Sequence, residues 1–163
     1  MTTYDFALVG AGIAGASLAA ELSLAGASVL LLEAEERPGY HATGRSAAFW
    51  EECYGGPEIV PLTLASGPYL RDGGFLLERG ALYIGREEDR ELVTGFLKRF
   101  IPTGATLQHL DRTELQRRVP GIRPAWSDAV WEPYCADIDV ASLHAHFLAQ
   151  ASKQGAAKEA SKQ

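Results

Sequence analysis

Cysteine and methionine are scarce in this chain, and basic residues are outnumbered. Its 163 residues include two cysteines and one methionine. Cys53 and Cys135 are far apart and form no CxxC pair, which excludes a disulfide framework and a cysteine-based zinc site and favours a reducing, cytoplasmic environment. Lys and Arg number 15 against 21 Asp and Glu, a formal net charge of -6. We therefore expect no nucleic-acid partner.

Long hydrophobic runs are absent too. No segment of the sequence approaches the ~18 apolar residues of a membrane-spanning helix. The N-terminal segment carries Asp5 and a glycine-rich turn from Gly10, which is not the pattern of a signal peptide. Hydrophobic residues nevertheless make up 47% of the chain, enough to build a core. We expect a soluble globular protein of about one domain.

A glycine-rich turn follows the first apolar run. Residues 6–9 lead into Gly10, Gly12 and Gly15, which have the GxGxxG spacing. In a dinucleotide-binding unit the first glycine permits the tight turn, the second lets a pyrophosphate approach the backbone, and the third lets the helix pack on the sheet. The phosphates then meet the free N–H groups at the start of the helix.

An acid, Glu33, ends the second apolar run about 20 residues after Gly12. A carboxylate there accepts hydrogen bonds from ribose hydroxyls and repels a 2′-phosphate, which favours FAD or NAD over NADP. A glycine-rich turn without a ligand is the alternative, because small residues also serve helix packing. The helix expected over 13–25 and the strand expected over 28–32 favour the dinucleotide site.

The rest of the chain alternates turn residues with periodic apolar residues. We expect an irregular loop over 35–46, a hairpin of 75–77 with 81–84 that begins a second antiparallel sheet, and extended segments over 106–110 and 129–134. Helices are expected over 46–53, 58–70, 87–100, from Asp111 to 118, and over 140–153, with Ser46, Asp111 and Asp139 as caps. Residues 155–163 contain no aromatic or β-branched residue, so no strand is expected after the last helix. The expected fold class is α/β with a Rossmann-like βαβ start, and the chain is expected to stop within the fold.

Two longer motifs resemble a known family. One is Arg37-Pro-Gly-Tyr-His-Ala-Thr-Gly-Arg-Ser-Ala-Ala48, which comes just after Glu33. The other is Ala136-Asp-Ile-Asp139 followed by Leu143-His144. Together they resemble the D-amino-acid oxidase-like family of FAD-dependent amine and amino-acid oxidoreductases, and most closely its D-arginine / D-amino-acid dehydrogenase branch. The resemblance covers residues 4 to about 152.

The resemblance implies a cofactor site and part of a substrate site. The glycine turn would hold the FAD pyrophosphate, Glu33 and Ala34 would meet the adenosine ribose, and the loop 42–49 would run beneath the flavin. The residues so implied to bind FAD are Gly10, Ala11, Gly12, Ile13, Ala14, Gly15, Glu33, Ala34, Ala42, Thr43, Gly44, Arg45, Ser46, Ala47, Ala48 and Phe49. Tyr54 matches a position that touches substrate.

The sequence departs from the D-arginine branch at two positions. Phe49 stands where that branch has a histidine, and Ala81 lies near the place of an acid that recognises a cationic side chain. A neutral or apolar amino or imino acid is therefore at least as good a candidate as arginine. The family's carboxylate-binding arginine is expected beyond position 163.

No catalytic acid, base or metal site can be argued from the sequence. His144 and His146 are two positions apart on an expected helix and cannot share a metal on one face. His41 in the loop is expected to be solvated, and Asp139 is better explained as a helix cap than as an acid–base catalyst. The resemblance also implies a second phosphate cradle, made by Ser46 at the start of its expected helix and by Arg45. The alternative is that Arg45 only caps the loop.

Three functional hypotheses follow. The first is an FAD-dependent oxidoreductase, or an N-terminal fragment of one, that oxidises the amine-bearing carbon of an amino acid or related amine by hydride transfer to flavin. The second is a non-catalytic fragment or nucleotide-binding subunit that needs a partner chain, and the third is an NAD-linked dehydrogenase. We expect residues 1–72 and 120–155 to form the FAD-binding part, 73–119 to begin a substrate-side or cap part, and 156–163 to be a polar tail.

Overall fold

The computed structural model describes residues 2–160. These residues form two compact units, one made of residues 2–48 with 139–160 and the other of Phe49–Ile138. The division assigns no function to either unit, so the expected split into an FAD-binding part and a substrate-side part stays a prediction. None of the helices in the described part is long and apolar enough to cross a membrane.

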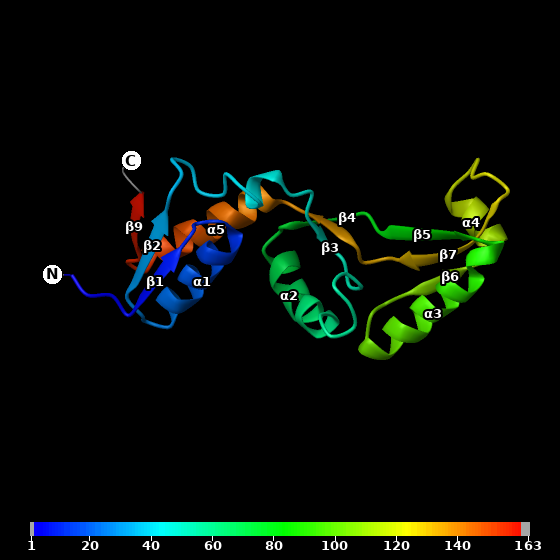
Figure 1. The fold of residues 1–163 in the computed structure, drawn as a ribbon, viewed down its shortest axis with the longest axis horizontal. Helices are drawn as coiled ribbons and strands as arrows, with labels where there is room; N and C mark the ends of the chain where they lie inside the picture. Colours follow the sequence, from blue (N-terminus) through cyan, green and yellow to red (C-terminus); the bar gives the residue numbers. More distant parts are fainter. Residues whose placement is uncertain (1, 161–163) are drawn as a thin grey trace. The chain divides into compact units, whose positions relative to one another are not determined.

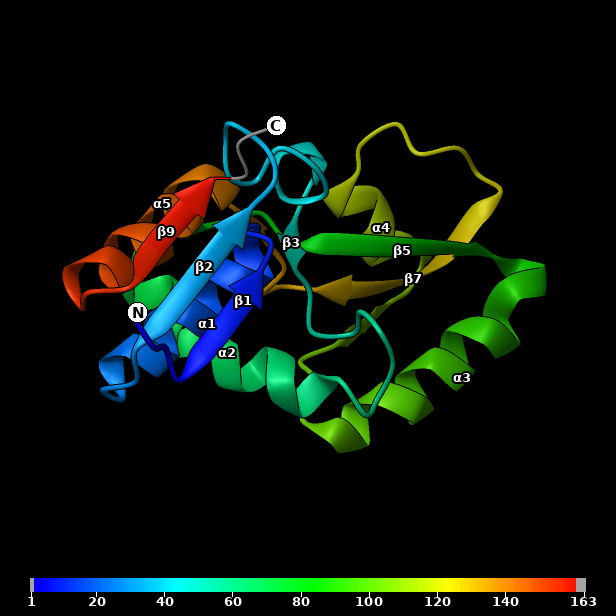
Figure 2. The same cartoon turned by 60° about the vertical axis from the view of Figure 1, so that its left-hand side comes forward.

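The first unit is a parallel sheet with two helices. Its elements are β1 (Phe6–Val9), α1 (Ile13–Leu24), β2 (Val29–Glu33), the short 3₁₀ helix η1 (Thr43–Arg45), α5 (Val140–Lys153) and β9 (Ala157–Ala160). The strand order is β1-β2-β9, and both pairs are parallel. Figure 2 shows the three strands in front of α1 and α5, which pack against each other. The predicted βαβ start is confirmed.

Small side chains explain how closely α1 packs. Ala16, Ala19 and Ala20 of this helix are fully buried, and so is Val29 of the neighbouring strand. Small residues let the helix backbone approach the sheet, and their apolar surface leaves water when it does. The sheet edge that carries the glycine turn is thereby fixed to the start of α1.

The end of the chain corrects one expectation. We expected no strand after residue 155, yet Ala157–Ala160 forms β9 and pairs in parallel with β2. Gly155, with φ +88°, makes the turn that follows α5. Backbone pairing with β2 therefore outweighs the weak strand propensity of these residues. The part of the expected polar tail at 161–163 lies outside the described residues.

The second unit holds two antiparallel sheets of three strands each (Figure 1). Their orders are β3-β8-β4 and β5-β7-β6. The elements are β3 (Phe49–Trp50), α2 (Val60–Asp72), β4 (Leu76–Glu78), β5 (Ala81–Arg86), η2 (Glu87–Asp89), α3 (Arg90–Phe100), η3 (Ile101–Thr103), β6 (Gln108–Leu110), α4 (Arg112–Arg118), β7 (Trp126–Glu132) and β8 (Ala136–Ile138). Helices α3 and α4 both pack on β7.

Two expectations for this unit are wrong. No helix covers 46–53, because Phe49 and Trp50 pair with Asp137 and Ala136 instead. The segments 75–77 and 81–84 do not pair as a hairpin, since β4 pairs with β8 and β5 pairs with β7. The backbone N–H groups of Arg79 and Gly80, between the two strands, both donate to the Cys135 carbonyl, so the chain passes from one sheet to the other.

The other predicted elements are present with small shifts in their ends. The helix expected over 58–70 spans Val60–Asp72, and the one expected over 87–100 begins as η2 and continues as α3. Asp111 caps α4 by accepting from the Glu114 backbone N–H, and Asp139 caps α5 by accepting from that of Ser142. Strand β8, which pairs with both β3 and β4, was not foreseen.

Candidate nucleotide-binding site

The glycine turn joins β1 to α1 in the geometry that its spacing predicts. Gly10 has φ +95°, a conformation that favours glycine, and its N–H donates to the Leu32 carbonyl at 2.7 Å. A Cβ on Gly15 would lie 1.9 Å from the Gly10 carbonyl oxygen. The start of α1 can approach the turn only because residue 15 has no side chain. Gly12 is the N-cap of α1 and has no side chain to cap the helix, so the first backbone N–H groups of α1 need other acceptors.

Glu33, at the end of β2, closes one side of the turn. Its Oε2 accepts from the Ala11 N–H at 2.8 Å and its Oε1 from the Glu35 N–H at 3.1 Å. The N–H of Glu35, and more weakly that of Ala11, holds the pKa of Glu33 below its ordinary value. The carboxylate is therefore ionised at neutral pH. Each oxygen has a further lone pair, which can accept a hydroxyl hydrogen.

The loop after β2 closes the other side of the turn. Thr43 Oγ1 accepts from the Ile13 N–H at 2.9 Å. A Cβ on Gly12 would lie 3.0 Å from the same oxygen, so the loop comes as close to the turn as a glycine allows. The loop is itself held by a 2.7 Å hydrogen bond from the Gly44 N–H to the Gly39 carbonyl.

These segments surround a cavity of about 390 Å³. The cavity is lined by Val9, Gly10, Gly12, Ile13, Ala14, Gly15, Glu33, Gly39, Tyr40, His41, Ala42 and Thr43. Eight of the residues expected to bind the cofactor are thus brought together at one place, and Ala11 lies behind them, fully buried. Six other residues expected to bind the cofactor do not line the cavity: Ala34, Gly44, Arg45, Ser46, Ala47 and Ala48. The Gly12 N–H, which has no acceptor among the described residues, and the ionised Glu33 carboxylate fit the diphosphate and ribose of a nucleotide.

Arg45 and Ser46 differ from the expectation of a second phosphate cradle. Ser46 follows η1 in an extended conformation and begins no helix, so it provides no helix N-terminus for a phosphate. The Arg45 guanidinium lies over the Tyr40 ring, 5.1 Å from its centroid. Tyr40 lines the cavity, and Arg45 is exposed beside it.

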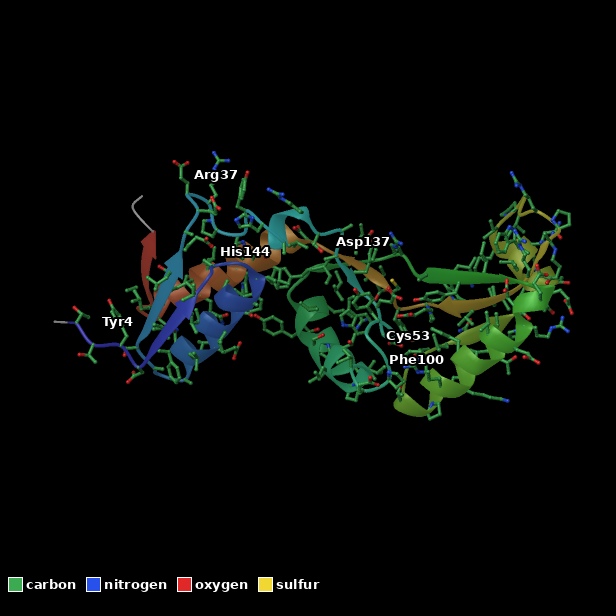
Figure 3. All side chains as sticks on the ribbon, in the orientation of Figure 1. Tyr4, Arg37, Cys53, Phe100, Asp137 and His144 are labelled. Atoms are coloured by element: carbon green, nitrogen blue, oxygen red, sulfur yellow. The ribbon has the colours of Figure 1, made fainter. Side chains whose placement is uncertain are left out.

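Sequence reasoning missed His144. This side chain is only 8% exposed, and its Nε2 lies 2.7 Å from the Ala11 carbonyl oxygen. Figure 3 shows it on α5, in the unit that contains the glycine turn, with Arg37 on the loop after β2. The available clue was its place beside Leu143 in the second motif, on the apolar face of the expected helix. His41, also given no role, lines the cavity and is 2.8 Å from Glu35 Oε1.

Phe49 and Tyr54 belong to the second unit. Phe49 lies in β3, and the Arg79 guanidinium is 4.4 Å from the centroid of its ring. Tyr54 is in a turn and is 76% exposed. Ala81 begins β5.

The second unit also contains a cluster of acids that the sequence did not indicate. Tyr83 donates its hydroxyl to Glu51 and lies 3.3 Å from Glu132 Oε2. Glu132, fully buried, accepts from the Glu52 N–H, and the buried Glu52 accepts from the Thr106 N–H. Burial, helped by the charges of Glu51 and Glu52, raises the pKa of Glu132 to about 7. Within residues 2–160 no group of three or more His, Cys, Asp or Glu side chains has the arrangement of a metal site.

Comparison with known families gives one match that covers most of the chain. The family model described as FAD dependent oxidoreductase (DAO) matches residues 5–159.

Solved structures with a similar fold include two oxidases and a deaminase. L-alpha-glycerophosphate oxidase from Mycoplasma pneumoniae, solved with FAD bound, has a TM-score of 0.87 at 17% identity. The match covers 98% of this chain and 45% of the oxidase chain. Glycine oxidase from Geobacillus kaustophilus has a TM-score of 0.78 at 24% identity, with 96% and 46% covered. L-amino acid deaminase from Proteus vulgaris has a TM-score of 0.79 at 20% identity, and the match covers 98% of this chain and 40% of the deaminase. The chain thus spans less than half the length of each, and the likeness shows a common fold.

Proposed function

Because the chain belongs to the DAO family of FAD dependent oxidoreductases, we propose that the cavity beside the glycine turn holds the adenosine diphosphate half of FAD. The single observation that carries this proposal is the meeting of three segments, the glycine turn, Glu33 and the loop at Thr43, around that cavity. The proposed binding residues are Gly10, Ala11, Gly12, Ile13, Ala14, Gly15, Glu33, Ala34, Ala42, Thr43, Gly44, Arg45, Ser46, Ala47, Ala48 and Phe49.

Glu33 is proposed to bind the adenosine ribose. Two backbone N–H groups already fix its carboxylate, and the remaining lone pairs can accept from the 2′ and 3′ hydroxyls. The same negative charge would repel a 2′-phosphate. The position therefore supports FAD, and it leaves NAD as the alternative that shares this fingerprint.

The diphosphate is proposed to lie against the glycine turn and the start of α1. Backbone N–H groups and the positive end of the helix favour an anion there. Thr43 keeps the loop against the turn, and Arg45, exposed beside Tyr40, can supply a cation. In this arrangement the chain's own groups bind and orient the cofactor and exclude water from its phosphates.

The reaction proposed for the whole enzyme is oxidation of the amine-bearing carbon of an amino acid or related amine. FAD, when bound, supplies the hydride acceptor. The family, with glycine oxidase and L-amino acid deaminase among proteins of similar fold, supports a small amine or amino acid as substrate. Tyr54, which is 76% exposed, is proposed to contact it because its position matches one that touches substrate in the D-arginine branch. The motifs support the D-arginine / D-amino-acid dehydrogenase branch, whereas the apolar Phe49 and Ala81 favour a neutral or apolar side chain.

A second candidate is a nucleotide-binding piece that needs a partner chain. Phe6, in edge strand β1, is 45% exposed, and Leu77 in β4 is 71% exposed. Apolar surface of this kind favours association with another polypeptide segment.

The two cysteines are free thiols, which supports a reducing, cytoplasmic location.

Anaerobic reduction separates the two candidates. The 163-residue chain, reconstituted with FAD, is mixed with glycine, neutral D- and L-amino acids and D-arginine, and oxidised-flavin absorbance is followed. Loss of that absorbance with an amino acid supports the complete reaction. Retention of bound, oxidised flavin with every substrate supports the binding piece, and the assay is then repeated with candidate partner chains. Parallel incubation with NAD in place of FAD tests the dehydrogenase, which requires amino-acid-dependent formation of NADH.

A further inference from the structure

We propose that His144 is a positioning residue that orients the Ala11–Gly12 peptide so that the Gly12 N–H is presented to the diphosphate. The proposal rests on the proposed FAD site and adds a residue to it. His144 comes from α5, more than a hundred positions along the chain from the turn. It would not touch the cofactor, and would act through the backbone of Ala11.

The hydrogen bond fixes which ring nitrogen carries the proton. His144 Nε2 lies 2.7 Å from the Ala11 carbonyl oxygen, and a carbonyl oxygen can only accept. Nε2 must therefore be protonated and donate. The ring is 8% exposed, so little water competes for this carbonyl.

The geometry of the peptide then fixes the direction of the next N–H. The described residues contain no cis peptide bond, and in a trans peptide the C=O and N–H point in opposite directions. With the Ala11 carbonyl turned toward α5, the Gly12 N–H is turned away from α5. Gly12 lines the cavity, which is where a diphosphate would meet that N–H.

The Gly12 N–H is free to bind a diphosphate, whereas the N–H groups on either side of it already have acceptors. The Ala11 N–H is bonded to Glu33 Oε2 and the Ile13 N–H to Thr43 Oγ1. Among the hydrogen bonds of residues 2–160, none is donated by the Gly12 N–H. A backbone donor without a protein acceptor at the N-terminus of a helix is suited to an anion.

His144 also holds the loop that forms the other wall. A Cβ on Gly39 would lie 2.9 Å from His144 Cε1 and 3.1 Å from Nδ1, so the ring packs directly against this glycine. One side chain thus contacts the turn through Nε2 and the loop through the adjoining Cε1 and Nδ1. Its two roles, donation and packing, can be separated by substitution.

Three variants make that separation. Gln in His144→Gln can place an amide donor near the position of Nε2 without the ring. His144→Phe keeps a ring of similar size and removes the donor, and His144→Asn has a donor too short to reach. His146→Gln, exposed on the same helix two positions later, is the matched control. Affinity for FAD and for ADP is measured by calorimetry, with thermal unfolding of each variant alongside.

Orientation by the donor predicts a specific order of affinities. His144→Gln and His146→Gln bind FAD and ADP within about twofold of the parent, and His144→Phe and His144→Asn bind roughly three- to tenfold more weakly, the effect of one hydrogen bond. Parent-like binding by His144→Phe, with weak binding by His144→Gln, would show that the ring serves packing alone and would overturn the proposal.

Nitrogen NMR gives a readout that needs no cofactor. On the ¹⁵N-labelled chain, His144 must be the Nε2–H tautomer, and the Gly12 amide resonance must shift in His144→Phe and stay in place in His146→Gln. An Nδ1–H tautomer, or an unchanged Gly12 amide in His144→Phe, contradicts the proposal even if the variants bind poorly or fold poorly. If the parent chain binds neither FAD nor ADP, the proposed function fails, whereas these NMR results still decide whether His144 orients the turn.

Discussion

The Ala11 backbone N–H donates to Glu33 Oε2 at 2.8 Å, and this bond joins the turn before α1 to the end of β2. The bond fixes the carboxylate beside the cavity without using all of its lone pairs. The glycine turn and Glu33, which define a dinucleotide site in the sequence, are therefore joined by a hydrogen bond in the fold. Substitutions in the turn and at Glu33 can each test this arrangement.

Glu33→Gln is expected to weaken FAD binding about tenfold, which corresponds to ~1.4 kcal/mol. The amide is neutral and can accept through one atom only, so it cannot keep both backbone bonds and still accept from the ribose hydroxyls. Calorimetric titration with FAD measures the change. Glu36→Gln, which removes the same charge at an exposed position three residues later, is the control and should bind FAD as the parent does. Equal affinities for the two variants would exclude a ribose contact at Glu33.

Thr43→Val is expected to cost about 1 kcal/mol of unfolding free energy, because valine has nearly the shape of threonine but cannot accept from the Ile13 N–H. The loop then loses its bond to the turn. Thr43→Ser keeps the hydroxyl and should recover most of the loss. Urea unfolding compares the two. A valine variant as stable as the parent would show that the hydrogen bond from the Ile13 N–H contributes nothing to the unfolding free energy.

Gly15→Ala is expected to destabilise the chain by about 2 kcal/mol or more, because the new Cβ would lie 1.9 Å from the Gly10 carbonyl oxygen and force the backbone to move. Gly95→Ala is the matched control. Gly95 lies within α3, and a methyl group there would have no neighbouring atom within 4 Å, so alanine should stabilise the helix by about 0.5–1 kcal/mol. Urea unfolding measures both, and a destabilisation of similar size at the two glycines would contradict the packing described for the turn.

Unfolding free energy is expected to fall as pH rises from about 4.5 to about 7. Burial raises the pKa of Glu132 from 4.5 to about 7, so in this window the folded chain keeps a proton that the unfolded chain releases. The stabilisation from this group is complete below pH 4.5 and is lost as pH passes 7, at up to about 1.4 kcal/mol per pH unit. Burial also raises the pKa of Glu52, which acts in the same direction.

Glu132→Gln should flatten this pH dependence, because the amide cannot ionise and its oxygen can still accept from the Glu52 N–H. Glu91→Gln, at an exposed position on α3, should leave it unchanged. Urea unfolding at several pH values measures both slopes. A parent chain with the same pH slope as Glu132→Gln between about pH 5 and 7 would contradict a raised pKa at Glu132.

Local patterns predicted the part of the site that is close together in sequence. Gly10, Gly15 and Glu33 lie within one βαβ unit, where a turn, a helix and the next strand have little freedom, and their spacing was enough to predict their arrangement. The caps at Asp111 and Asp139 were predictable for the same reason, because each accepts from a backbone N–H three residues later.

Long-range pairing decided what the sequence could not show. The segment at Phe49 is a strand only because β8, some ninety residues later, lies beside it. Glu132 gave no sign that Glu51, Glu52 and Tyr83 would surround it. The hydrogen bond of His144 could not be predicted either, because its partner, the Ala11 carbonyl, belongs to a turn far away in the sequence. In β9, pairing with β2 outweighs a composition that favours no strand.

Calorimetric titration of the 163-residue chain with FAD, ADP, NAD and NADP tests the proposed cofactor site most directly. We predict that FAD binds with one site per chain, that ADP competes for it, and that NADP binds more weakly than NAD because of the charge on Glu33. Failure of FAD and ADP to bind a folded chain, or tighter binding of NADP than of FAD, would contradict the proposed site.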